Sequence, residues 1–203
     1  MAKKKAKSVD LFTVVDHYDS GIKVFDYKGV RSTQVVGVEK AIDELNKTTH
    51  GNPFNVIVHM GTAEGGFINL LADHDISRAA ELHTFDVNTK SKNNLFKNVL
   101  FHNVDVFEDN VVEDILDTKG RVLLLCDGDN KLKKFNTFVP FLKKDDVIMV
   151  HSYVRDTELF EKKYKGTVWN WHSFSDADAN LENLEPLIQD VFAPYVWCVR
   201  IVK

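Results

Sequence analysis

The chain has 203 residues, 44% of them hydrophobic and 28% charged, which suits a globular protein with one well-buried core and is short for two. Its formal net charge of -4 argues against nucleic-acid binding through overall positive charge. No apolar run approaches the length that crosses a bilayer, and the basic start is not followed by the apolar segment of a secretory signal. We therefore expect a cytoplasmic protein without membrane association.

The two cysteines, Cys126 and Cys198, each lie inside an apolar run, so we expect buried, reduced thiols. A disulfide is the alternative if the two strands are neighbours. Four lysines form a short basic tail, which is most simply a solvated chain end, with a contact to nucleic acid or to an acidic partner as the alternative. These lysines are Lys3, Lys4, Lys5 and Lys7.

Residues 1–35 read as an N-terminal tail followed by a flap. Within them, residues 21–31 consist of two short extended pieces around Lys28-Gly29, which predicts a flap or an edge hairpin over the sheet. Apolar residues at helical spacing predict a helix over 36–47. The next segment, 55–60 (NVIVHM), is a short apolar strand that runs directly into glycines.

Helix and strand patterns alternate from here on, which indicates a parallel sheet with crossover helices. A helix opens at 67–72, and a strand follows at 82–87. A weak helix at 90–97 precedes a third short strand at 99–102. The following helix, marked by apolar residues at 111–116, is expected to have an acidic first turn with Glu108 and Asp109, as the helix dipole prefers.

The strand at 121–126 (RVLLLC) is the most apolar of the chain, so we expect it in the centre of the sheet. A helix over 131–139 and a strand over 146–151 follow. Apolar residues at helical spacing then predict a late helix over 181–191, weakened by a proline, before a closing strand at 195–202.

Together these elements predict one Rossmann-like α/β domain over 36–203. We expect a three-layer sandwich with a mostly parallel sheet and an antiparallel C-terminal strand. Phe135, Phe138 and Phe141 lie at helical spacing and are expected in the core. His59, inside an apolar strand, is expected to be a core histidine bonded to backbone.

A glycine-rich loop, Gly61-Thr62-Ala63-Glu64-Gly65-Gly66, joins the first parallel strand to its helix. Such a loop lets a ligand approach the backbone closely. It also places the free N–H groups of the helix at the carboxyl end of a parallel strand, where α/β sheets bind ligands. A tight turn without a ligand explains the glycines alone equally well.

The second strand strengthens the case for a ligand because it ends in Asp86. An acidic side chain at this position can accept both hydroxyls of a ribose, although a turn aspartate is the alternative. In the nicotinamide fingerprint the middle glycine lets a pyrophosphate approach the backbone. Here Ala63 replaces that glycine. The loop therefore favours a ligand without a diphosphate, such as S-adenosylmethionine. Another Rossmann-like enzyme, acting with nicotinamide or on a nucleotide sugar, remains the competing reading.

In this order the motifs resemble the class I S-adenosylmethionine-dependent methyltransferases, and most of all their cephalosporin hydroxylase-like and small-molecule O-methyltransferase branch. The resemblance covers about residues 28–155. Besides the glycine loop and Asp86, it rests on NVDVFED at 103–109, on Asp127-Gly128-Asp129-Asn130 and on Val150-His151-Ser152-Tyr153. Each motif is weak alone, and their joint order is more specific.

The resemblance implies a set of cofactor contacts. The glycine loop would wrap the methionine and ribose part, Asp86 would hold the ribose hydroxyls, and Asp105 would accept a hydrogen bond from the adenine amino group. The segment 127–130 would face the transferred methyl group. The residues expected at the cofactor are Gly61, Thr62, Glu64, Gly65, Gly66, Asp86, Asp105 and Asp127.

The chain departs from the family pattern at three positions. His59 stands where a glutamate is usual, Asn130 where a histidine is usual, and Ser152 where an aspartate is usual. In metal-dependent relatives the first aspartate of this segment and that later aspartate hold magnesium. Here Asp127 and Asn130 are the candidate ligands, and a site so poor in carboxylates would bind magnesium weakly.

Methyl transfer from a sulfonium mainly requires that donor and acceptor be positioned, with a base for a hydroxyl acceptor. Asp127, Asp129 and His151 are the expected catalytic residues, with His172 as a further titratable group. A helix cap at 127–130 and a satisfied strand-end histidine are the alternatives.

An aromatic-rich stretch follows the last parallel strand and could line an acceptor pocket, although packing of the outer helix layer is favoured. It consists of Tyr153, Trp169, Trp171 and His172.

We therefore expect methyl transfer to a small-molecule acceptor, at oxygen. A relative that keeps the cofactor site but has lost turnover is the alternative, because the usual histidine and aspartate are replaced. The N-terminal segment could cover the pocket as a lid or mediate a homo-oligomer such as a dimer, and the sequence leaves both possibilities open.

Overall fold

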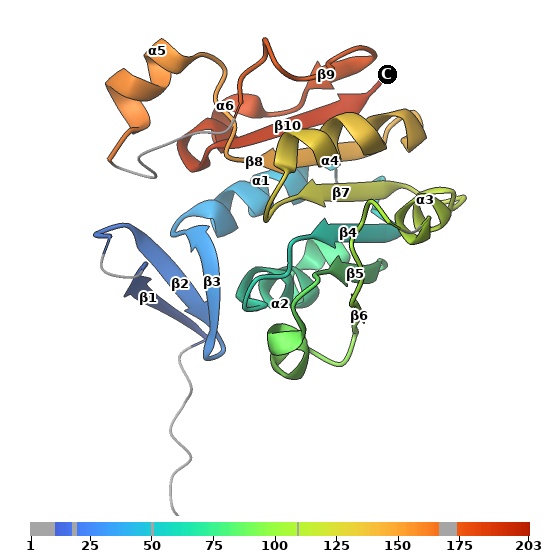
Figure 1. The fold of residues 1–203 in the computed structure, drawn as a ribbon, viewed down its shortest axis with the longest axis horizontal. Helices are drawn as coiled ribbons and strands as arrows, with labels where there is room; N and C mark the ends of the chain where they lie inside the picture. Colours follow the sequence, from blue (N-terminus) through green and yellow to red (C-terminus); the bar gives the residue numbers. More distant parts are fainter. Residues whose placement is uncertain (1–10, 18–19, 50, 109, 167–173) are drawn as a thin grey trace, which may run out of the picture.

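The computed structural model describes residues 11–17, 20–49, 51–108, 110–166 and 174–203. The predictions made for the N-terminal lysines and for Trp169, Trp171 and His172 lie outside these residues. Figure 1 shows a large sheet with helices on both faces and a smaller sheet beside it.

The main sheet has seven strands in the order β6-β5-β4-β7-β8-β10-β9. Strands β4 to β8 run parallel to their neighbours, whereas β10 runs antiparallel to β8 and β9 antiparallel to β10. The strands are β4 (Val56–Met60), β5 (Glu81–Phe85), β6 (Val99–His102), β7 (Val122–Cys126), β8 (Val147–His151), β9 (Leu184–Pro186) and β10 (Trp197–Val202). The predicted fold class, with an antiparallel C-terminal strand, is confirmed. The central place of β7, whose five residues are all buried, is confirmed as well.

Helices cover both faces of this sheet (Figure 1). The side chains of α1 and α2 form one core with alternate residues of the strands, and those of α3 and α4 form a second core on the opposite face. This alternation is why β4, β7 and β8 are buried at every position. The α-helices are α1 (Val38–Thr49), α2 (Gly66–Asp73), α3 (Val111–Leu116), α4 (Lys131–Phe138), α5 (Thr157–Leu159) and α6 (Gln189–Phe192).

Short helical turns complete the connections. The segment predicted as a weak helix at 90–97 is a 3-10 helix, Thr89–Asn94. The other 3-10 turns are Asp75–Ser77, Val139–Phe141 and Ala193–Tyr195, and Phe160–Tyr164 is a π-helix. Among the described residues, none of the helices combines the length and the apolar character that a membrane-crossing segment needs.

The N-terminal segment forms a separate antiparallel sheet of three strands, β1 (Phe12–Asp16), β2 (Lys23–Tyr27) and β3 (Val30–Val35). The two predicted extended pieces correspond to β2 and β3, which turn at Lys28-Gly29 with both residues at positive φ. The sequence reading missed β1, which has mostly exposed residues and so lacks a strong apolar alternation. Figure 1 shows this sheet on the side toward which β4 and β7 point.

Gly66 allows β3 to pack against the start of α2. A Cβ atom on Gly66 would lie 2.5 Å from the carbonyl carbon and oxygen of Arg31 and from the carbonyl oxygen of Val30. These are backbone atoms and cannot turn aside as a side chain would. The last glycine of the loop therefore serves the packing of the N-terminal sheet.

The prediction of a late helix over 181–191 is wrong. Leu184–Pro186 instead forms the edge strand β9, and only the short helix α6 follows. Proline cannot continue a helix by donating a backbone hydrogen bond, and Ile188 adopts a left-handed conformation with φ 42°. Leu184 is buried in the core from this edge strand, so its apolar character does not require a helix.

The predictions that the two cysteines and three phenylalanines are buried have different outcomes. Cys126 and Cys198 are buried free thiols, as expected. Phe135 and Phe138 are fully buried, but Phe141 is 44% exposed, because α4 ends at Phe138 and a 3-10 turn breaks the helical spacing.

We predict that Gly66→Ala lowers the free energy of unfolding by about 3 kcal/mol, because the added methyl group overlaps the backbone of β3. Gly29→Ala is the matched control, since its Cβ meets nothing within 4 Å and only its positive φ costs about 1 kcal/mol. Urea denaturation of both variants measures the difference. Equal losses of unfolding free energy in the two variants would show that β3 does not pack on Gly66.

Candidate functional site

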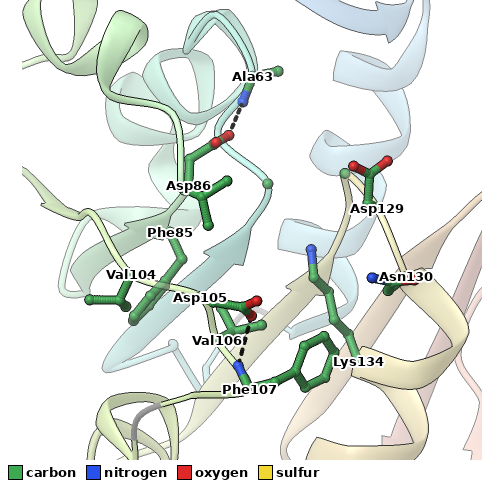
Figure 2. A pocket seen from close by; sticks show the side chains of 13 residues that line it. Ala63, Phe85, Asp86, Val104, Asp105, Val106, Phe107, Asp129, Asn130 and Lys134 are labelled. Carbon is green, nitrogen blue, oxygen red and sulfur yellow. Dashed lines mark hydrogen bonds between the residues drawn. The ribbon is translucent and has the colours of Figure 1, made fainter.

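A cavity of about 330 Å³ opens at the carboxyl ends of β4, β5 and β7 (Figure 2). Strand ends of a parallel sheet converge there, and their loops supply the walls. Its lining residues are Gly61, Ala63, Phe85, Asp86, Val87, Val104, Asp105, Val106, Phe107, Gly128, Asp129, Asn130 and Lys134. Three carboxylates and one lysine thus face a space whose remaining walls are largely apolar.

Asp86 closes one side of the cavity. One carboxylate oxygen accepts a hydrogen bond from the backbone N–H of Ala63 at 3.1 Å, and the other accepts from Asn88 N–H at 2.8 Å. The amide of Asn103 donates to the carbonyl oxygens of Asp86 and Val87, which holds this turn in place. The carboxylate is therefore positioned against the glycine loop and keeps lone pairs for a ligand.

Figure 2 shows Asp105 below Asp86, with Asp129 and Lys134 on the other side of the view. One oxygen of Asp105 accepts a hydrogen bond from Phe107 N–H at 3.0 Å. Val87, which is 69% exposed, and Val104 also line the cavity and give it apolar surface.

The glycine loop divides between the cavity and the core. Gly61 and Ala63 line the cavity with positive φ values of 112° and 50°. A Cβ on Gly61 would lie 2.6 Å from the carbonyl carbon of Asp127, so glycine is needed where the two loops touch. Thr62 is buried, and its hydroxyl lies 2.7 Å from that of Thr84.

The remaining predicted residues of this loop lie outside the cavity wall. Gly65 and Gly66 face Leu95 and β3, respectively, and Glu64 is exposed. Of the eight residues expected at the cofactor, the structure brings Gly61, Asp86 and Asp105 to the cavity.

The segment after β7 turns sharply into α4. Gly128 and Asn130 both have positive φ, and Asn130 makes no side-chain cap hydrogen bond to the helix. Asp129 and Asn130 are exposed and line the cavity mouth (Figure 2). Asp129 is therefore the one expected catalytic residue that faces this space.

Lys134 is a cavity residue that the sequence reading did not single out. Its side chain is 8% exposed, and its ammonium donates to the carbonyl oxygen of Asp127 at 2.6 Å and contacts that of Met60 at 3.4 Å. The ammonium thus ties together the loops after β4 and β7. Burial lowers the pKa of Lys134. In the sequence, Lys134 is a charged residue at a helical position that faces the core together with Phe135 and Phe138. This pattern could have identified it.

Asp127 does not line the cavity. It is 7% exposed, and it continues the alternation of Leu123 and Leu125, which pack with α1 and α2. Its carboxylate accepts from Gln34 Nε2 at 2.7 Å and from Gly128 N–H at 2.8 Å, and it lies 3.3 Å from His151 Nδ1. Burial by itself raises the pKa of Asp127, but His151, Lys131 and His59 outweigh it and hold that pKa well below its ordinary value.

His151 is 5% exposed and its ring lies 4.9 Å from that of Trp197. Ser152, which follows it, has φ 63° and a buried hydroxyl without a hydrogen-bond partner among the described residues. Asp127 and His151 are thus brought together, as the family pattern implies, but within the protein and away from the cavity.

Magnesium coordination by Asp127 and Asn130 finds no support in this geometry. Asn130 faces the cavity, while the oxygens of Asp127 accept bonds within the protein. Within the described part of the chain, no group of three or more histidine, cysteine or acidic side chains is arranged to hold a metal ion.

His59 is buried, as expected, but its bond is not to backbone. Its Nδ1 lies 3.2 Å from the hydroxyl of Thr84, and its Nε2 has no hydrogen-bond partner within the residues that the structure describes. Thr84 sits directly opposite His59 on the neighbouring strand, so a side chain meets the ring first. Burial lowers the pKa of His59 to about 4.

Tyr153, expected in an aromatic stretch, packs against Phe174. Its hydroxyl lies 2.6 Å from Asp176 and 3.1 Å from the guanidinium of Arg200. Tyr153 does not line the cavity described above, but it lines a second cavity of about 240 Å³ together with Phe160 and Tyr164. The structure therefore leaves both predicted roles of this residue open.

No protein-family model and no curated protein sequence matches this chain. Solved structures do resemble it. CmcI in an apo form has a TM-score of 0.61 at 11% identity, over 87% of this chain and 75% of that chain. MtNAS in complex with MTA and tNA has a TM-score of 0.53 at 10% identity, over 81% of this chain and 59% of that chain. A protein assigned as a caffeoyl-CoA O-methyltransferase from Staphylococcus aureus has a TM-score of 0.45 at 21% identity, over 59% of this chain and 58% of that chain.

We predict that His59→Gln flattens the pH dependence of stability between pH 6.5 and about 4. The folded protein keeps His59 neutral down to about pH 4, whereas the unfolded chain takes up the proton near 6.5. The stability that depends on a neutral His59 is therefore complete above pH 6.5 and is lost as the pH falls toward 4. Urea midpoints across this range should show wild type losing up to about 3 kcal/mol more than the variant. Parallel curves would contradict the assignment.

We predict that Lys134→Met lowers the free energy of unfolding by about 2 kcal/mol, because two buried carbonyl oxygens lose their charged donor. Lys144→Met, at an exposed position, should change it by less than about 0.5 kcal/mol. Thermal and urea denaturation measure both. A Lys134 variant as stable as the control would mean that the two loops hold together without the ammonium.

Proposed function

We propose that this chain, whose fold is that of the class I S-adenosylmethionine-dependent methyltransferases, binds S-adenosylmethionine in the cavity at the ends of β4, β5 and β7. It then transfers the methyl group to a small-molecule acceptor, at oxygen. One observation carries the proposal. The carboxylates of Asp86 and Asp105 face one cavity from adjoining strand ends, and apolar residues and the Gly61 loop line the same cavity.

The lining fits an adenosine with a positive charge at its far end. Asp86 would accept the two ribose hydroxyls, and Asp105 would accept from the adenine amino group. Val87 and Val104 would cover the faces of the adenine ring. The excess of carboxylates over the one lysine favours a cationic ligand over a diphosphate.

When bound, S-adenosylmethionine supplies an electrophilic methyl group. The chain's own task is to align the acceptor oxygen with it, and this positioning is the larger part of the acceleration. As the carbon–oxygen bond forms and the carbon–sulfur bond breaks, the hydroxyl proton must leave. Asp129, exposed at the cavity mouth, is the carboxylate placed to receive it directly or through water.

A second function has a specific observation in its favour. Asp127 and His151, expected to act in catalysis, are buried and bonded within the protein. A protein that binds the cofactor without turnover would have the same cavity. Formation of S-adenosylhomocysteine in the presence of candidate acceptors separates the two functions, because a non-catalytic binder forms none.

Isothermal titration with S-adenosylmethionine and S-adenosylhomocysteine tests the proposed ligand. Binding of either supports the cavity assignment and leaves the acceptor to be found. Failure of both to bind, together with binding of NAD, would replace the proposal with a nicotinamide enzyme.

We predict that Asp86→Ala weakens binding of S-adenosylmethionine roughly 100-fold, because two hydrogen bonds to a carboxylate are lost. Asp117→Ala removes a carboxylate that is 88% exposed and outside the cavity, and it should leave the affinity unchanged. Titration calorimetry of both variants measures the effect. Unchanged affinity in Asp86→Ala would place the ribose elsewhere.

A further inference from the structure

We infer that Gln34 takes the place of a metal ion at Asp127, so that the buried centre around this carboxylate holds no cation and includes the N-terminal sheet. The physical basis of the inference is the set of contacts around one buried carboxylate.

Both oxygens of Asp127 are already bound by N–H donors. Oδ2 accepts from Gln34 Nε2 at 2.7 Å, and Oδ1 accepts from Gly128 N–H at 2.8 Å and faces His151 Nδ1 at 3.3 Å. These distances are those of ordinary and charge-assisted hydrogen bonds. A cation bound to the carboxylate would have to displace at least one of these donors.

The orientation of the Gln34 amide is set by a second contact. Its oxygen accepts from the indole N–H of Trp197 at 2.9 Å, and Gln34 and Trp197 are both buried. An indole nitrogen can only donate, so the amide oxygen must face Trp197 and the amide nitrogen must face Asp127. The donor at Asp127 is therefore held in place from both ends.

Ser152, at the second metal-ligand position of the family pattern, does not supply the carboxylate that a cation would need. It offers a neutral hydroxyl where a carboxylate is usual, and that hydroxyl is buried without a partner in the described part of the chain. A lone carboxylate and a hydroxyl are a poor ligand set for magnesium, which prefers carboxylates, phosphates and water. The residues present thus fit a hydrogen-bonded network better than a cation.

The network makes β3 a structural part of the centre. Gln34 lies on β3, Asp127 follows β7 and Trp197 opens β10, so three segments distant in the sequence meet at one side chain.

Manganese, which substitutes for magnesium and is paramagnetic, tests the inference on the protein alone. Indole N–H signals of ¹⁵N-tryptophan-labelled protein are recorded with and without manganese, and Trp197→Phe identifies the signal of Trp197. In wild type we expect that signal to keep its intensity. Selective broadening of it in wild type, abolished by Asp127→Asn, would show a metal at Asp127 and overturn the inference.

Gln34→Ala provides the second measurement. We expect the Trp197 indole signal to shift upfield, because its acceptor is removed. Thr33→Ala, the neighbouring position on β3, should leave it unmoved. An unmoved signal in Gln34→Ala would show that the amide does not bridge Trp197 and Asp127. If this variant does not fold, the manganese titration of wild type decides alone.

Neither measurement uses S-adenosylmethionine, so the two proposals fail separately. A protein that binds no cofactor loses the proposed function, while the manganese result still reports on Asp127. A protein that binds the cofactor only with magnesium, and whose Trp197 signal broadens, keeps the proposed function and loses the cation-free centre.

Discussion

The contact between the backbones of Gly61 and Asp127 is the constraint on which the carboxyl edge of the sheet depends. The loops after β4 and β7 approach so closely that a Cβ on Gly61 would lie 2.6 Å from the carbonyl carbon of Asp127. The Lys134 ammonium joins the two loops from the side of α4. Because the loops are held together, the cavity opens on one side of them and the buried Asp127 network lies on the other.

This division separates two kinds of polar residue that lie near each other in the sequence. Asp129 and Asn130 follow Gly128 and face the cavity, while Asp127 points into the protein. Burial of a carboxylate is costly unless hydrogen bonds and opposite charge compensate it. Gln34 and His151 provide this compensation, and the N-terminal sheet is thereby bound to the main domain.

Much of the fold and part of the site could be predicted because they follow from local pattern. The apolar run of β7 has to be central, and Asp86 has to emerge at the carboxyl end of β5, since parallel strands present their ends at one edge. The late helix could not be excluded in this way, because the spacing of Leu184 and its neighbours suits a helix as well as a buried strand edge.

The sequence by itself thus determined the class of fold, the glycine loop and the two acids of the proposed nucleoside site, because each depends on residues close together in the chain. Only the tertiary structure decided that Gly66 serves β3, that Lys134 lines the cavity and that Gln34 lies against Asp127. The reason is physical: these contacts join segments as far apart as β3 and β10, and no local spacing records which buried donor will meet which acceptor.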